Sequence, residues 1–406
     1  MVAPGTRGVF EPEPQQSLED FNQRVTLATS YSGRHNSLNF IRLVLALLVI
    51  VSHAIVLGGY GSESIFGKTT LGTMAVYGFF GISGFLIAGS AAHNDPGNYI
   101  WRRCLRILPG FWVCLLVTAF FFGLVGWLTG PVPAKFHSDA STYFSAPHGP
   151  FSFVFQNILL KMRQLFIVSR AWVPAWNGSL WTLFYEFLCY ILLGVLAILG
   201  CLKRRAIVLA LLVVSWVAEI SITLIPSANH QFNHLHNYDG LNLLTFVPIF
   251  LTGAVIWLYR EKVPDSGLLA LGCSVLFVIS LWLPFGAHAP GFSLTSSTVF
   301  GPMLAYPLLW LGIHLPFQKI GARNDYSYGV YIYAYPVQIL LAIWGVQHWG
   351  YPAYLFLCVL GTIPFAVASW WLIEKRSLRL KNRFDGSALW VRMVGPPRTK
   401  APSANP

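Results

Sequence analysis

The sequence predicts an all-α protein, a polytopic integral membrane bundle of about ten transmembrane helices. The chain has 406 residues, of which 55% are hydrophobic and only 10% are charged, whereas a soluble domain carries about 25% charged residues. Apolar runs recur from Leu38 nearly to Ile373, and each crossing of a bilayer needs about 20 such residues. Helices are expected because an open sheet edge cannot satisfy its backbone groups in lipid.

The chain is expected to contain one membrane domain over residues 35–380. Residues 1–34, rich in Pro, Gln, Glu and Ser, and the basic residues 381–406 lack a helical apolar face, so both are predicted to be disordered cytoplasmic tails. The polar stretch before the first apolar run makes a cleavable signal peptide unexpected. The ten expected spans are 38–57, 71–90, 107–128, 180–200, 206–225, 241–259, 267–284, 298–315, 327–346 and 352–373.

The net charge of +12 is explained by membrane topology. When both termini are placed in the cytoplasm, 21 of the 27 basic residues lie in cytoplasmic segments. This asymmetry follows the positive-inside rule. The charge therefore predicts an orientation with both termini cytoplasmic, and contact with anionic lipid rather than with nucleic acid.

Two ionisable residues lie inside the first span, where charged side chains are costly and commonly functional. Arg42 and His53 are eleven residues apart, close to three helical turns, so they share one face about 16 Å apart along the axis. His53 is the candidate catalytic base, because imidazole can accept a hydroxyl proton near neutral pH. The alternative interpretation of His53 is a structural histidine that is hydrogen-bonded between helices. The alternative for Arg42 is that its side chain snorkels to the cytoplasmic interface.

Three arginines gather at the entrance to the third span, at positions 102, 103 and 106. Guanidinium groups bind phosphate in a bidentate manner, which makes Arg103 and Arg106 candidates for holding a phosphorylated donor. Positive-inside anchoring explains the same cluster without a ligand. The segment alone does not separate the two interpretations.

The segment SLWTLFYE opens the fourth span. Glu186 is expected about two turns inside the membrane, at a depth similar to that of His53. A carboxylate there either orients His53, binds an acceptor hydroxyl or makes a structural bond between helices. Ser179 and Trp181 are candidates for lining a pore or binding the acceptor, and Ser179 is equally a candidate helix N-cap.

Three other segments have uneven polarity. The ninth span starts with five tyrosines, of which Tyr331 and Tyr335 are candidates for lining a pore, while others fit an interfacial belt. The small residues of segment 79–86 favour close helix packing. The long loop 129–179 is either part of an acceptor site or a variable connector.

His230, His234 and His236 lack a second cluster of metal-binding residues, so no metal site is expected.

The motifs occur in a fixed order: Arg42 and His53 with ten residues between them, FFGISGFLI, RRCLRILP, SLWTLFYE, DYSYGVYIYAYP and LIEK. Together they resemble the acyltransferase 3 family of membrane acyltransferases over about residues 35–380. The resemblance implies an O-acyltransferase of a bacterial inner membrane that binds no resident cofactor. It would use cytoplasmic acyl-CoA, commonly acetyl-CoA, as co-substrate and acylate a hydroxyl of an extracytoplasmic glycan or glycolipid, such as lipopolysaccharide or exopolysaccharide.

The resemblance also assigns residues. The family's essential histidine and paired arginine fall on His53 and Arg42, and many relatives have histidine where this chain has Tyr335. The Arg-x-x-Arg pair and the SLW…E motif fall on Arg103, Arg106, Ser179, Trp181 and Glu186. The alternative function is a transporter or flippase of a polysaccharide precursor, in which buried polar residues bind a translocated substrate. It lacks support from an internal repeat or from paired broken helices.

Overall fold

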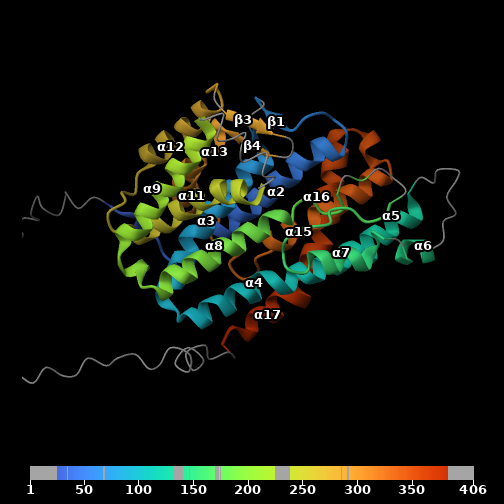
Figure 1. Cartoon of the computed structure of the whole chain (residues 1–406), viewed down its shortest axis with the longest axis horizontal. Coiled ribbons are helices and arrows are strands. Elements are labelled where there is room, and N and C mark those ends of the chain that lie inside the picture. The colour runs from blue at the N-terminus through green and yellow to red at the C-terminus, as the bar shows by residue number, and fades with distance from the viewer. Residues whose placement is uncertain are drawn as a thin grey trace, which may run out of the picture.

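The structure is a computed structural model, and it describes residues 25–33, 35–66, 69–130, 140–145, 147–169, 173, 175–224, 238–284, 286–289 and 292–382. Long helices lie side by side in one bundle, with two short hairpins at one end and α17 at the other (Figure 1). The longer helices are α2 (Leu38–Leu57), α3 (Leu71–His93), α4 (Pro96–Val117), α8 (Trp181–Ile198), α9 (Arg205–Leu224), α11 (Tyr238–Leu258), α12 (Gly267–Ser280), α14 (Ala305–His314), α15 (Ser327–Ile343) and α16 (Tyr351–Ser369).

Shorter elements complete the described fold. The strand pairs β1–β2 and β3–β4 are both antiparallel. A π-helical turn joins α4 to α5, and another joins α16 to α17. The short elements are α1 (Leu27–Ser30), β1 (Ser64–Ile65), β2 (Thr69–Thr70), α5 (Gly123–Thr129), α6 (Ala140–Ser145), α7 (Pro150–Asn157), β3 (Gly286–Ala289), β4 (Phe292–Thr295), α13 (Ser296–Val299) and α17 (Lys375–Arg379).

The helical fold class agrees with the sequence prediction, but ten membrane spans are not confirmed. Seven helical segments of the described chain are long and apolar enough to cross a bilayer. Helix α12 has 14 residues and α15 has 17, so at 1.5 Å per residue both are shorter than a hydrocarbon core of about 30 Å. The predicted span 298–315 is interrupted by a 3-10 turn at Gly301–Leu304, which contains Pro302. Proline lacks the backbone N–H that a continuous helix needs there.

The outer helices expose apolar side chains, as contact with lipid requires. Val214 of α9 is 65% exposed and Leu268 of α12 is 82% exposed, although both lie in apolar helices. A water-soluble protein rarely leaves such contiguous apolar faces uncovered. These faces support an integral membrane protein.

The first described residues differ from the prediction of a disordered tail. Leu27 is fully buried, and its backbone N–H donates to the carbonyl of Val263 at 3.0 Å. The N–H of Asp265 donates in turn to the carbonyl of Val25 at 2.9 Å. The N–H of Ala28 also donates to the carbonyl of Arg260 at 3.1 Å. Residues 25–33 therefore pack onto the loop after α11, because one apolar side chain and three backbone bonds hold them there. Most of both predicted tails lies outside the described residues.

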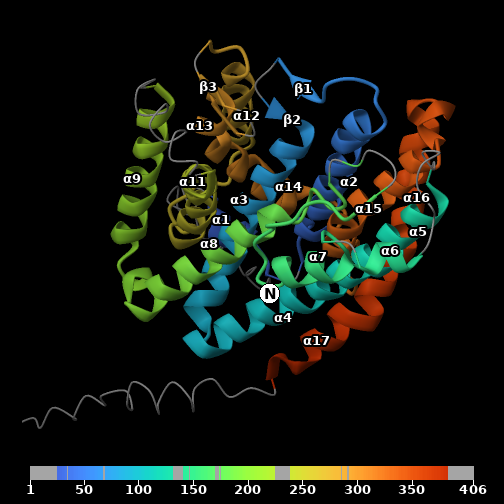
Figure 2. The same ribbon diagram turned by 45° about the vertical axis from the view of Figure 1, so that its right-hand side comes forward.

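Helix α3 lies at the centre of the bundle, against α2 on one side and α11 on another (Figure 2). Its glycines let α11 approach closely: a Cβ atom added to Gly84 would lie 1.9 Å from the carbonyl oxygen of Phe250. A Cβ atom on Gly253 of α11 would lie 2.0 Å from the carbonyl oxygen of Gly81. The predicted packing role of segment 79–86 is confirmed, and it brings the helices around the site together.

Candidate active site

One cavity of the bundle, the large cavity, collects several of the predicted site residues. It has a volume of about 560 Å³, and His53, Ser179, Trp181 and Tyr331 all line it. Helices α2, α3, α8, α11 and α15 and the β1–β2 hairpin contribute its walls. Its other polar lining residues are mostly hydroxyl or amide side chains: Ser64, Thr69, Thr70, Thr73, Thr182, Asn242, Thr245 and Thr298. Such a lining suits a neutral ligand with many hydroxyl groups.

His53 lies beside a carboxylate that the sequence analysis did not select. Its Nδ1 atom is 3.8 Å from Oε2 of Glu63, and the two side chains are 25% and 22% exposed. Ser52 Oγ donates a hydrogen bond to the same oxygen of Glu63. Glu63 can therefore orient the imidazole and stabilise its protonated form. The available signal was an acidic residue in the short connection that follows the histidine-bearing helix.

The ring of Tyr335 packs against the ring of His53. The two ring centroids are 5.2 Å apart at an interplanar angle of 74°, and Tyr335 is not among the lining residues of the large cavity. The tyrosine therefore limits the positions that the imidazole can adopt. It does so without offering a second ring nitrogen beside His53.

Ser179 lines the large cavity, and its hydroxyl is buried. Its residue is 2% exposed, and its Oγ has no hydrogen-bond partner in the described part of the chain. Helix α8 starts at Trp181 with Leu180 at the N-cap position and no side-chain cap, so the interpretation of Ser179 as an N-cap is wrong. A buried polar atom without a partner is costly, and a bound ligand can satisfy this one.

A second, narrow cavity of about 30 Å³ contains the other predicted residues, Arg42 and Glu186. Glu186 accepts hydrogen bonds from Ser83 Oγ at 2.8 Å and from the Tyr190 hydroxyl at 2.5 Å. The structure thus pairs His53 with Glu63 and places Glu186 in a bond network between helices. The interpretation that Glu186 orients His53 is wrong, because similar membrane depth did not bring the two side chains together. Any other catalytic role of Glu186 stays a prediction.

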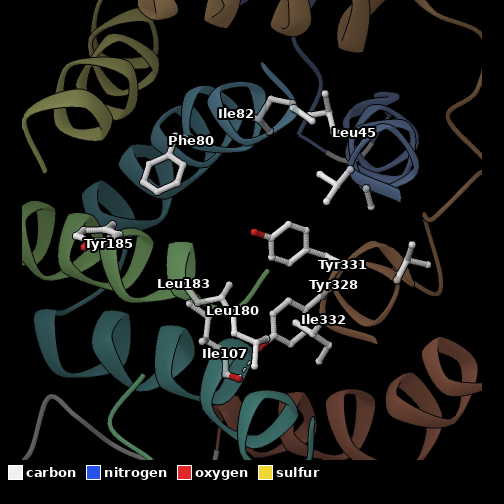
Figure 3. Close-up of a cluster of buried hydrophobic side chains, with 14 of the residues drawn as sticks. Leu45, Phe80, Ile82, Ile107, Leu180, Leu183, Tyr185, Tyr328, Tyr331 and Ile332 are labelled. Carbon is white, nitrogen blue, oxygen red and sulfur yellow. Dashed lines mark hydrogen bonds between the residues drawn. The ribbon is translucent and has the colours of Figure 1, made fainter. Parts of the chain in front are cut away.

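Tyr331 separates these two cavities. It lines both, as Val76 and Thr182 also do. Its hydroxyl lies 2.6 Å from Thr182 Oγ1 and donates to the carbonyl oxygen of Ser179 at 2.8 Å. Figure 3 shows the ring extending from α15 toward the space between α3 and α8, above Leu180 and Leu183. The side chain is therefore a partition held by two polar contacts.

Two of the three predicted donor-binding arginines lie in one ion-pair network. Arg42 Nη1 is 3.0 Å from Asp325 Oδ2, and Arg106 contacts the same oxygen at 2.5 Å and Glu374 Oε2 at 3.4 Å. Burial by itself raises the pKa of Asp325, but the two guanidinium groups and hydrogen bonds from Ser327 outweigh it and lower the pKa to about 2. Asp325 is therefore ionised at neutral pH, and its carboxylate is shared by Arg42 and Arg106.

Arg103 is set apart from that network. It lines none of the cavities around Arg42 and His53, and its Nε is buried without a hydrogen-bond partner among the described residues. Tyr99 and Tyr190 are its neighbours. The two arginines of the Arg-x-x-Arg motif thus have different surroundings, and donor binding by either one stays a prediction.

A third cavity, of about 540 Å³, lies next to Asp325 and shares Ser327 with the narrow cavity. Helix α2 passes all three: Asn39 lines the third, Arg42 the narrow one and His53 the largest. From Asn39 to His53 the helix rises about 21 Å at 1.5 Å per residue. The cavities are therefore arranged in series along α2, with the partition at Tyr331 between the last two.

The remaining predictions concern the long loop and the histidines. Of the loop 129–179, Gly178 and Ser179 line the large cavity, so the loop contributes its last residues to the site. Across the described ranges, no group of three or more His, Cys, Asp or Glu side chains could hold a metal ion. The histidines at 230, 234 and 236 lie outside the described residues.

Comparisons with known proteins indicate the family of the chain. A family model described as an acyltransferase domain (Acyl_transf_3) matches residues 35–371. The chain is 29% identical over 351 residues to an O-acetyl transferase of Shigella phage Sf6, covering 85% of this chain and 96% of that relative. It is 28% identical over 380 residues to nodulation protein 10 of Rhizobium leguminosarum bv. viciae, covering 89% and 98%. No solved structure has significant similarity.

Proposed function

The chain belongs to the acyltransferase 3 family. We propose that this membrane acyltransferase moves an acyl group, namely acetyl, from acyl-CoA to a hydroxyl of a glycan or glycolipid. Membership in the family and similarity to an O-acetyl transferase make it an O-acyltransferase. The observation that supports the finer proposal is the His53–Glu63 pair in a cavity lined by hydroxyl and amide groups. A sugar offers the complementary hydroxyls, and one of them can lie within reach of the imidazole.

His53 acts as the general base in this proposal. Its imidazole takes the proton of the acceptor hydroxyl while the hydroxyl oxygen attacks the thioester carbonyl carbon. The carbon–sulfur bond breaks, and the proton passes from His53 to the departing thiolate of CoA. Glu63 stabilises the imidazolium that exists between the two proton transfers. Ser179 Oγ and Trp181 are assigned to holding the acceptor.

The donor approaches from the opposite end of α2. The third and narrow cavities lead from Asn39 past Arg42 toward His53, so the thioester arm would extend along the helix face that Arg42 and His53 share. Arg42, Arg103 and Arg106 are the donor-side cations, and Glu186 lines the same narrow passage. The charge asymmetry of the sequence supports placing this end, and both termini, in the cytoplasm of a bacterial cell.

Thiol release by purified protein tests the proposal. With acetyl-CoA and a glycan acceptor, the wild-type protein should release CoA thiol, and both His53→Ala and His53→Gln should lower the rate by about 10²–10⁴-fold, the usual contribution of a general base. The exposed His93 on α3 provides the matched control, because His93→Gln should keep a near-normal rate. A His53 variant with wild-type rate at normal membrane levels would make the histidine structural. A flippase would release no thiol at all.

A further inference from the structure

The third cavity has the properties of a phosphate site. We propose that it binds the nucleotide phosphates of the acyl-CoA donor, and that Lys319 and Arg323 are the cations that hold them. This inference rests on the proposed function, because it concerns the donor of that reaction. It assigns the phosphates to a loop before α15. Neither the arginine motif nor the spacing of Arg42 and His53 on α2 had indicated this loop.

Charge pairing favours this loop over Arg42 and Arg106. Both arginines already pair with Asp325, and Arg106 also contacts Glu374, so a phosphate near them would compete with these carboxyl groups. Lys319 and Arg323 line the third cavity and form no ion pair within the part of the chain that the structure describes. Asp325 also lines this cavity, but its carboxylate is already paired with Arg42 and Arg106. The charges of Lys319 and Arg323 are therefore available to an anion.

The loop that carries these cations is held in place. Gly321 has a φ of +74°, a left-handed conformation that favours glycine. Asn39 Nδ2 donates to the carbonyl oxygen of Gly321 at 2.9 Å, which fixes the loop to the first turn of α2. The two cationic residues thus project from a turn with a defined backbone, so less conformational freedom is lost when an anion binds.

The surrounding space matches a nucleotide in extent. The third cavity of about 540 Å³ adjoins another hollow of about 420 Å³, and both are lined by Asn39 and Ala322. Tyr31 and Asn36 line the adjoining hollow, where an aromatic ring and an amide can contact a purine base. In the other direction Ser327 connects the third cavity with the narrow passage. A nucleotide placed here leaves its thioester arm directed along α2.

Two donors and one inhibitor test the proposal. The double variant Lys319→Gln/Arg323→Gln should raise the KM for acetyl-CoA about tenfold, equivalent to about 1.4 kcal/mol. It should leave the KM for S-acetylpantetheine, which lacks the nucleotide phosphates, unchanged. Adenosine 3′,5′-bisphosphate should inhibit the wild type with acetyl-CoA as donor, and inhibit the double variant about tenfold more weakly. The matched control is Lys203→Gln/Arg204→Gln, two exposed basic residues between α8 and α9.

Each outcome decides one point. Unchanged KM for acetyl-CoA in the Lys319/Arg323 variant, or unchanged inhibition by the bisphosphate, overturns the phosphate site while thiol release still supports the proposed function. An equal rise in KM in the Lys203/Arg204 control also overturns it, because general surface charge would then explain the effect. A wild-type protein that consumes no thioester overturns the proposed function and this inference together.

Discussion

Replacing Glu63 with glutamine removes the negative charge beside His53 and keeps the size of the side chain. The distance of 3.8 Å between Glu63 Oε2 and His53 Nδ1 permits direct stabilisation of an imidazolium. The glutamine oxygen can still accept the hydrogen bond from Ser52 Oγ, so the loop should keep its position. The variant therefore changes the electrostatics of the site with little effect on its shape.

The expected magnitude follows from that distance. Two unit charges about 4 Å apart attract by about 4 kcal/mol at an effective dielectric constant of 20. Because His53 and Glu63 are each about a quarter exposed, water screens part of this attraction. Glu63 is therefore expected to stabilise the transition state by about 1–3 kcal/mol. The rate constant kcat should then fall roughly 10- to 100-fold, since 1.36 kcal/mol corresponds to a factor of ten.

Steady-state kinetics of thiol release measure the effect. The KM for acetyl-CoA should change little, because Glu63 lies in the large cavity and away from the donor end of α2. Glu63→Asp keeps the charge and should recover part of kcat. A Glu63→Gln protein with unchanged kcat would refute the reasoning, and so would a loss expressed only in the KM for acetyl-CoA.

Two further predictions concern the scaffold and its orientation. Gly84→Ala should lower the thermal melting temperature of the purified protein, because its Cβ would lie 1.9 Å from the carbonyl oxygen of Phe250. Gly272→Ala on α12, with no neighbouring atom within 4 Å, should leave the melting temperature unchanged. Equal melting temperatures of the two variants would contradict the packing argument. In a background with the six native cysteines replaced, Ser62→Cys should react with an impermeant maleimide on whole cells and Lys203→Cys should not. The reverse labelling pattern would invert the proposed topology.

Local sequence rules predicted those parts of the site that depend on one helix. Arg42 and His53 do lie on one helix and line successive cavities, because a spacing of eleven residues fixes their relative direction. The glycines of segment 79–86 likewise allowed close packing to be predicted without a known partner helix. Both inferences use only the geometry of a single element.

The partners of those residues could not be predicted in the same way. Asp325 is 283 residues from Arg42 along the chain, and no periodicity links positions so far apart. Glu186 was placed with His53 because both were expected at one depth in the membrane. Depth alone does not determine in which direction around the membrane normal a side chain points. Glu63 was not selected because it lies outside the apolar span, where a carboxylate is not costly and so does not indicate a functional site. Tertiary contacts decided all three.

Tyr331 connects the donor and acceptor arguments. The narrow cavity beside it has a volume of about 30 Å³, enough for about one water molecule and too small for a thioester arm. A donor that enters past Arg42 must therefore displace the Tyr331 ring or its neighbours before its carbonyl reaches His53. The hydroxyl gives up its contacts with Thr182 and Ser179 when this happens. The same bonds separate the narrow passage from the large cavity, so the donor route proposed above requires the Tyr331 side chain to move.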